Sequence, residues 1–167
     1  MPIHIATAQP VDAPMIARLV GELLREITDA IGRQAFAYSL VDTEARARAW
    51  LEEGSYTVLL ARDGESVAGF LTLSECRALY AEGRFGILAE LYVCPDRRSH
   101  GVGRALVAEA KRVAGLKGWA RLEVTTPPLP QFDRALAFYE RQGFTVSGGR
   151  KMRSEERRVG KECRSRW

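Results

Sequence analysis

The chain has 167 residues, of which 46% are hydrophobic and 28% are charged, and its formal net charge is +4 at pH 7. This length and mixture predict one globular domain that buries its own core, and they exclude a disordered chain. Three cysteines without a close pair and two histidines without metal-ligand spacing predict neither a disulfide framework nor a metal site.

The longest apolar runs, such as residues 56–61, are far shorter than the about 20 residues that a membrane-spanning helix needs. Residues 1–5 lack the basic start and the long apolar stretch of a signal peptide. We therefore expect a cytoplasmic protein without membrane contact.

The sequence pI of about 9.2 suggests nucleic-acid binding, but the C-terminal segment 154–167 carries half of the net charge, with five basic and three acidic residues. This segment has neither helical nor strand periodicity and resembles read-through of vector or adapter sequence. Our hypothesis is that it is not native. We expect a domain over residues 1–153, an irregular basic tail over 154–167, and no nucleic-acid partner unless the tail is native.

The first half of the chain reads as a strand over residues 3–8, a helix from Asp12 to Gly32, a second helix over 43–53, and a hairpin of strands 56–61 and 66–74. The first helix carries Glu22, Glu26 and Asp29 on one face. Such a row is typical of a solvated surface.

The second half predicts a central strand over 85–93, a helix from about 101 to 118, a strand over 121–125, a helix over 133–141, and a terminal strand pair that starts at 144. This order predicts an α/β domain. Its sheet is expected to be mixed and mostly antiparallel, with six to seven strands flanked by helices.

The loop between the central strand and the next helix is suited to an anion. Gly101 and Gly103 remove side chains that would keep a ligand from the backbone, and the following helix presents its N-H groups and positive dipole end. No Gly-Lys-Ser/Thr follows, which argues against an ATP or GTP loop. The third glycine of a dinucleotide-binding fingerprint is missing as well.

The segment Arg-x-x-Gly-x-Gly at 98–103, placed between an apolar strand and an amphipathic helix, resembles the acyl-CoA site of the GCN5-related N-acetyltransferase (GNAT) family. A second segment, Ala-Leu-Ala-Phe-Tyr-Glu-Arg-Gln-Gly-Phe at 135–144, is similar to that family's Ala-x-x-Phe-Tyr-x-x-x-Gly-Phe. The resemblance covers roughly residues 3–152. It implies the GNAT fold, with a sheet splayed between the fourth and fifth strands, and acetyl-CoA as co-substrate.

The resemblance also implies which residues hold acetyl-CoA. Backbone N-H groups of the loop would bind the pyrophosphate, with a side-chain contact from Arg98, and the strand edge would pair with the amides of the pantetheine arm. The cofactor-binding residues are then Leu91, Tyr92, Val93, Arg98, Ser99, His100, Gly101, Val102, Gly103 and Arg104. Ser99 stands where the family often has glycine, and Phe132 where it often has a cofactor-contacting asparagine.

Transfer of an acetyl group to an amine requires a neutral nucleophile and a proton for the departing thiolate. Glu90 is the first candidate for the base and Glu123 the second, since both lie in strands that border the expected gap. Tyr139, within the second motif, is the candidate donor of the proton to sulfur. Each of the three also has a structural interpretation: a carboxylate bonded to a neighbour, or a tyrosine packed beneath the sheet.

We therefore expect an acetyl-CoA-dependent N-acetyltransferase in which a primary amine attacks the thioester directly. The alternative is a catalytically silent acyl-CoA-binding regulatory module. The resemblance also implies that the first helices line the acceptor site, where the row of Glu22, Glu26 and Asp29 would form an acidic wall that attracts a cationic amine. The acceptor itself, a small molecule or a peptide amine, is not defined by these motifs. A homodimer is compatible with the sequence.

Overall fold

The computed structural model describes residues 2–154, so residues 155–167 of the expected tail lie outside the described residues. Short 3₁₀ turns at Pro10–Asp12, Leu79–Ala81 and Pro95–Arg97 connect the longer elements. Those elements are β1 (His4–Thr7), α1 (Ala13–Ile31), α2 (Leu40–Glu53), β2 (Tyr56–Asp63), β3 (Ser66–Ala78), β4 (Gly83–Val93), α3 (Val102–Leu116), β5 (Leu122–Val124) and α4 (Asp133–Arg141).

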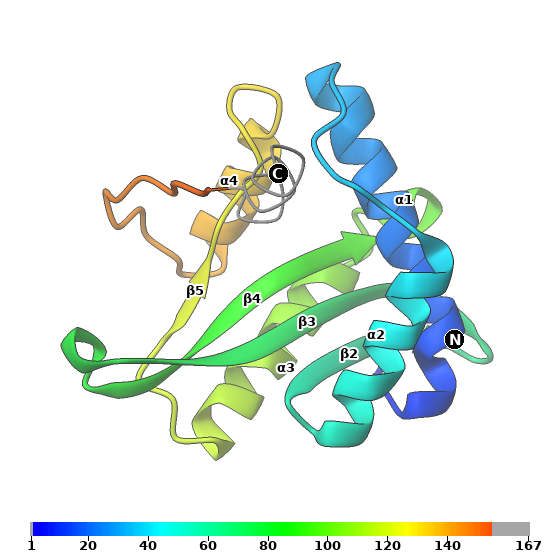
Figure 1. The fold of residues 1–167 in the computed structure, drawn as a ribbon, viewed down its shortest axis with the longest axis horizontal. Coiled ribbons are helices and arrows are strands. Elements are labelled where there is room, and N and C mark those ends of the chain that lie inside the picture. The colour runs from blue at the N-terminus through cyan, green and yellow to red at the C-terminus, as the bar shows by residue number, and fades with distance from the viewer. Residues whose placement is uncertain (1, 155–167) are drawn as a thin grey trace, which may run out of the picture.

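The strands form one sheet in the order β1-β2-β3-β4-β5, in which only β4 and β5 are parallel (Figure 1). The predicted mixed, mostly antiparallel sheet is confirmed. The predicted count of six to seven strands is wrong for the described residues, because residues 144–154 form no strand. At the β5 edge of the sheet, only three residues are available for pairing before the chain turns away toward Pro127 and Pro128.

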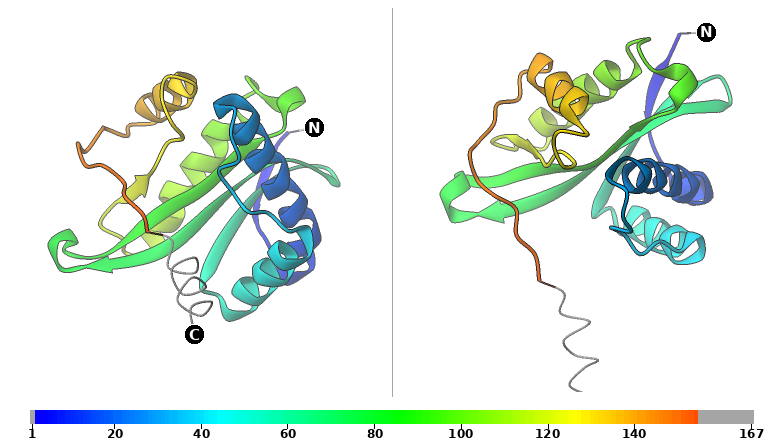
Figure 2. Two further views of the ribbon diagram at one scale, coloured as in Figure 1. Left: turned by 45° about the horizontal axis from the view of Figure 1, so that its top comes forward. Right: turned by 90° about the horizontal axis from the view of Figure 1, so that it is seen from above.

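Helices cover both faces of the sheet. Figure 2 shows α1 and α2 on one face and α3 and α4 on the other. Side chains of β2 alternate between the two cores, as the period of a strand requires: Val58 and Leu60 pack toward α1, whereas Leu59 and Ala61 pack with Leu106 of α3.

Helix α2 begins at Leu40, three residues before the predicted start. Ser39 has an extended backbone, and its hydroxyl accepts a hydrogen bond from the N-H of Asp42 at 3.3 Å. Ser39 is therefore the N-cap. The predicted start is late because the first turn of the helix precedes the residues with helical apolar spacing.

Strands β4 and β5 are paired over only three residues each, from Gly86–Leu122 to Leu88–Val124. Strand β4 then continues to Val93, while the chain after β5 turns away toward α4 (Figure 1). The predicted splay between the fourth and fifth strands is confirmed. Beyond Leu88, no described strand pairs with the edge of β4 that faces β5.

Candidate active site

A bulge in β4 lies just beyond the point where β5 separates from it. The register between β3 and β4 passes from Leu73–Leu88 to Leu71–Leu91, so Ala89 and Glu90 together stand opposite Thr72. A bulge of this kind redirects a side chain and frees a backbone group from the ladder. Here the freed N-H of Glu90 donates to Thr72 Oγ1 at 3.0 Å.

The Glu90 carboxylate is held by two hydroxyl groups. Tyr56 Oη donates to Glu90 Oε2 at 2.5 Å, and the Thr72 hydroxyl donates to the same oxygen. The other oxygen, Oε1, receives no hydrogen bond from a described residue. Glu90 is half-buried, so this oxygen belongs to a carboxylate that is oriented but still accessible.

Tyr56 is fixed in turn by α2, where its ring lies 5.1 Å from that of Trp50. Burial, followed by the negative charge of Glu90, raises the pKa of Tyr56 well above its ordinary value. Tyr56 is therefore a permanent hydrogen-bond donor to Glu90 at neutral pH. Single-sequence reasoning missed both Tyr56 and Thr72; the one signal for Thr72 is a lone hydroxyl in the apolar run 70–73.

Glu123, the second candidate base, occupies a different environment. It lies on β5 opposite Ile87, within the paired segment of the two strands, and accepts a hydrogen bond from Arg121 Nε at 2.8 Å. Its side chain is 44% exposed. Glu90 lies beyond the separation of the strands, whereas Glu123 lies before it.

Tyr139 is 7% exposed, and its ring packs between those of Phe138 and Phe144 at centroid distances of 5.3 and 5.5 Å. Every fully buried side-chain polar atom among the described residues has a hydrogen-bond partner, whereas the Tyr139 hydroxyl bonds to no described residue. The small exposed part of Tyr139 therefore includes its hydroxyl. Burial raises the pKa of Tyr139 to about 12, so the hydroxyl keeps its proton at neutral pH.

Glu90 and Tyr139 approach β4 from opposite faces. Tyr139 belongs to the core on the α3 side, while Tyr56, the partner of Glu90, packs against the core on the α1 side. Both faces meet at the unpaired edge of β4. Glu90 and Tyr139 therefore lie on opposite faces of the sheet.

The loop after β4 has the geometry expected of an anion-binding site. Gly101 has φ 81° and is the N-cap of α3, where no side chain caps the helix. The first N-H of the helix that bonds to the Gly101 carbonyl is that of Ala105, at 2.9 Å. The N-H groups of the first helical turn therefore stay available at the positive end of a long helix. Ser99 also has a positive φ, 63°, which explains why a glycine suits this position.

The small size of Gly103 also serves the packing of two helices. A Cβ at this position would lie 3.3 Å from the Phe138 ring, so the missing side chain allows α3 to approach α4. A ligand at this loop would therefore meet the backbone N-H of Gly103, because Phe138 fills the space where a side chain would lie. A Cβ at Gly101 would instead lie in open space.

The three arginines near the loop differ in the partners of their side chains. Arg97 is paired with Asp63, and Arg98 donates to the Val93 carbonyl at 2.9 Å and to Glu26 at 2.6 Å. Arg104 is exposed and forms no ion pair within residues 2–154, and the ring of exposed His100 contacts the Arg98 carbonyl. A ligand at the loop would meet Arg104 directly and would compete with Glu26 for Arg98.

Residues 91–93 supply the strand edge. Leu91, Tyr92 and Val93 pair with β3 on one side and with no described strand on the other. Tyr92 is buried, and its hydroxyl donates to Glu22 at 3.1 Å. Two members of the acidic row on α1, Glu22 and Glu26, therefore face the end of β4 rather than bulk solvent alone.

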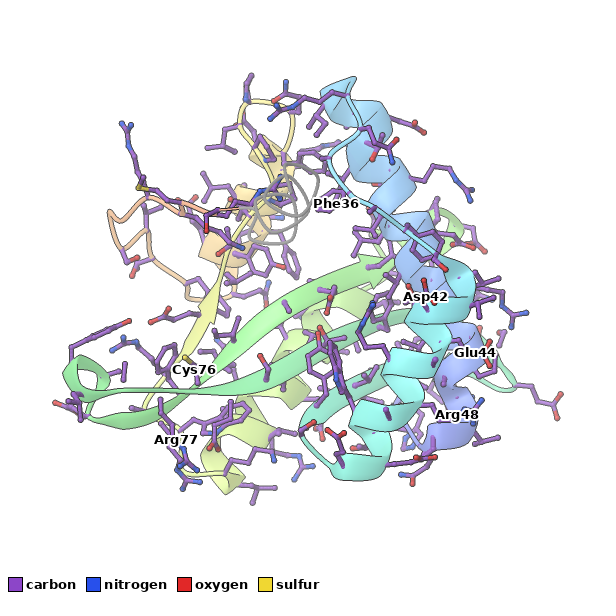
Figure 3. All side chains as sticks on the ribbon, in the orientation of Figure 1. Phe36, Asp42, Glu44, Arg48, Cys76 and Arg77 are labelled. Carbon is purple, nitrogen blue, oxygen red and sulfur yellow. The ribbon has the colours of Figure 1, made fainter. Side chains whose placement is uncertain are left out.

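Two surface hollows lie away from these groups. The first, of about 580 Å³, is lined by residues around Arg77 on the β3–β4 hairpin, and the second lies on α2 around Glu44 and Arg48. Figure 3 shows Arg77 and Arg48 far from one another on the two sides of the molecule. Among residues 2–154, no group of three or more His, Cys, Asp or Glu side chains could hold a metal ion, and no helix is long and apolar enough to cross a membrane.

Residues 54–146 match the family model of the acetyltransferase (GNAT) domain. The chain is 29% identical over 150 residues to the uncharacterized N-acetyltransferase YhfO of Bacillus subtilis (strain 168), covering 88% of this chain and 93% of that protein. Among solved structures, a putative acetyltransferase from Arthrobacter sp. FB24 has 28% identity and a TM-score of 0.70, covering 91% of this chain and 92% of that one. An integron cassette protein from the mobile metagenome of Cole Harbour Salt Marsh has 23% identity and a TM-score of 0.74, covering 90% and 89%.

Proposed function

Because the chain belongs to the GNAT acetyltransferase family, we propose that it uses acetyl-CoA to acetylate a primary amine by direct attack on the thioester. One observation carries the proposal: Glu90 and Tyr139 flank the unpaired edge of β4 from opposite faces of the sheet. A base on one face and an acid on the other are the two groups that this transfer requires.

The residues that would hold acetyl-CoA fit its chemistry. The uncapped start of α3 offers N-H groups to the pyrophosphate, and Arg104 adds a positive charge. The edge of residues 91–93 pairs with no second described strand and can pair with the pantetheine amides as an added strand would, once Arg98 leaves the Val93 carbonyl. When bound, acetyl-CoA supplies the activated acetyl group.

Glu90 acts on the nucleophile. A free alkylamine has a pKa near 10.4, so only about one molecule in 2,500 is neutral at pH 7. The ammonium first gives one proton to solvent, and the neutral amine then attacks the carbonyl carbon of the thioester. As the carbon–nitrogen bond forms and the carbon–sulfur bond breaks, the nitrogen gives its second proton to Glu90 Oε1, directly or through a water molecule. Glu90 is preferred to Glu123, which is paired with Arg121 and lies outside the splay.

Tyr139 acts on the leaving group by donating its phenolic proton to sulfur, so that a free thiol departs. The pKa of about 12 lies about 3.5 units above that of an ordinary thiol, about 8.5. The proton therefore stays on Tyr139 in the resting site and moves to sulfur only as the carbon–sulfur bond breaks and negative charge builds up on the leaving group. Proton exchange with solvent then restores the phenol and the Glu90 carboxylate.

The test is a thiol-release assay with acetyl-CoA and a panel of diamines, amino acids and lysyl peptides, beside a calorimetric titration with CoA. We expect turnover on at least one amine. We also expect Tyr139→Phe to lower kcat by about 10- to 100-fold while CoA binding is retained. CoA binding with no turnover on any amine would refute the enzyme and favour the regulatory module.

A further inference from the structure

We infer that Tyr56 and Thr72 are positioning residues that fix one oxygen of Glu90, so that the other oxygen faces the amine. The inference rests on the proposed function, because it takes Glu90 as the base. It adds two residues, from β2 and β3, to a site that the sequence motifs confine to β4, the loop and α4. Neither residue belongs to the motifs at 98–103 and 135–144.

The bulge ties Glu90 to Thr72 twice. In a regular antiparallel ladder the N-H of Glu90 would pair with a carbonyl or face the other edge. Instead it donates to Thr72 Oγ1 at 3.0 Å, and the Glu90 carboxylate returns to the same hydroxyl. One threonine therefore fixes both the backbone and the side chain of Glu90.

Tyr56 and Thr72 each have one hydroxyl proton, and the hydrogen bonds show where each proton points. Thr72 Oγ1 accepts from the Glu90 N-H, so its single proton is free for Glu90 Oε2. The Tyr56 hydroxyl is 2.5 Å from Glu90 Oε2 and 3.0 Å from Thr72 Oγ1, and its one proton goes to the nearer, charged oxygen. Both protons thus point at Oε2, and Oε1 is left to take the amine proton.

The burial of Thr72 points to the same role. Thr72 is 1% exposed and is the one buried side chain of the described residues that is neither apolar nor aromatic. A hydroxyl is costly in a core unless it is hydrogen-bonded, and a valine of the same shape would pack without that cost. The hydroxyl bonds are made to Glu90 and Tyr56, so Thr72 is explained by the carboxylate rather than by packing.

The experiment compares Tyr56→Phe, Thr72→Val and Thr72→Ser on the amine with the highest turnover in the thiol-release screen. Loss of a hydrogen bond to a charged group predicts a decrease in kcat of about 10- to 100-fold for Tyr56→Phe and Thr72→Val. The KM for acetyl-CoA should stay within about two-fold, because neither residue lies at the loop. Thr72→Ser keeps the hydroxyl and should retain kcat within about three-fold.

A pair of substitutions at Thr72 separates positioning from packing. Thr72→Val keeps the shape of the side chain, whereas Thr72→Ser keeps the hydroxyl, so a packing role predicts that Thr72→Val is the milder change and a positioning role predicts that Thr72→Ser is. Tyr80→Phe is the matched control for Tyr56→Phe: Tyr80 is 77% exposed at the tip of the β3–β4 hairpin, and its substitution should leave kcat unchanged.

A double variant distinguishes this inference from the proposed function. In a Glu90→Gln background, adding Tyr56→Phe should change kcat by less than about two-fold, because both substitutions act through one carboxylate. If Glu90→Gln lowers kcat while Tyr56→Phe and Thr72→Val leave kcat unchanged, the positioning role is overturned and the base stands. If Glu90→Gln itself leaves kcat unchanged, the base is refuted and the positioning role falls with it.

Discussion

Substitution by alanine should have opposite effects on stability at the two ends of α3. A Cβ added at Gly101, the N-cap, or at Gly115, in the last turn, would lie in open space with no neighbouring heavy atom within 4 Å. Gly101 has φ 81°, a left-handed conformation that costs an L residue about 1–2 kcal/mol. Gly115 is the last but one residue of α3 and has no positive φ, so alanine is favoured over glycine there by up to about 0.5–1 kcal/mol.

We expect Gly101→Ala to lower the free energy of unfolding by about 1–2 kcal/mol and Gly115→Ala to raise it by about 0.5–1 kcal/mol. With a urea m-value of about 2 kcal/mol/M, the midpoint should decrease by about 0.5–1 M in the first variant and increase by about 0.25–0.5 M in the second. Equilibrium urea unfolding followed by circular dichroism measures both shifts.

A third variant, Gly101→Asn, tests the cause. Asparagine tolerates the left-handed region better than alanine, so Gly101→Asn should lose clearly less stability than Gly101→Ala. If Gly101→Ala and Gly115→Ala shift the midpoint in the same direction, or if Asn and Ala are equivalent at 101, the backbone argument for this loop is wrong.

Two further predictions concern the paired end of β4. A Cβ at Gly86 would lie 2.3 Å from the Trp119 ring. Gly86→Ala should therefore lower the free energy of unfolding by about 2–3 kcal/mol and the thermal midpoint by about 4–10 °C. An unchanged midpoint would contradict this packing. The Trp119 indole donates to Glu75 at 2.9 Å, and this bond, followed by the charge of Arg84, lowers the pKa of Glu75 below 4.5. A lowered folded-state pKa gives stability that is present above 4.5 and is lost as the pH falls through the folded value. The difference in unfolding free energy between wild type and Glu75→Gln should therefore narrow below pH 4.5, and a difference that is constant from pH 3 to 7 would exclude this role for Glu75.

Local patterns in the sequence predict much of the fold. The bounds of α4 are the predicted ones, because its apolar spacing begins after a Pro-rich linker and ends before Gly143. The glycine loop and the strand before it are also local, so one segment holds the information for both. The terminal strand pair failed because a strand also needs a partner, and the length of β5 is a tertiary property.

The candidate site is less predictable than the fold, because its contacts join distant positions. Tyr56 lies 34 residues from Glu90, and Thr72 lies 18 residues from it. Their meeting depends on the hairpin register and on one bulge, and a shift of one residue would turn the side chains to the opposite face. Glu90 was identified as a candidate by its place in the strand; its two hydroxyl partners required the three-dimensional structure.

Arg98 shows how the structure refines a predicted ligand contact. Its guanidinium is bonded to Glu26 at 2.6 Å, and both side chains are about two-fifths exposed. Exposed pairs of this kind contribute about 0–1 kcal/mol, so the pair is easily broken. A pyrophosphate carries more negative charge than one carboxylate and should displace Glu26 from Arg98.

If Glu26 competes with the ligand, Glu26→Gln should tighten CoA binding by up to about five-fold, which is the factor that 1 kcal/mol represents. Arg98→Ala should weaken binding by about 10- to 100-fold, and added salt should reduce both effects. Isothermal titration with CoA measures the dissociation constants. Glu109→Gln is the control, since Glu109 pairs with Arg112 on α3 and should leave binding unchanged.

The sign of the Glu26→Gln effect decides between two roles for this pair. Tighter binding means that Glu26 holds Arg98 away from the ligand until the ligand arrives. Weaker binding, comparable to that of Arg98→Ala, would mean that Glu26 orients Arg98 toward the ligand, and competition would be refuted. Because Glu26 stands on α1 and Arg98 follows β4, either result would couple α1 to the loop after β4 through one ion pair.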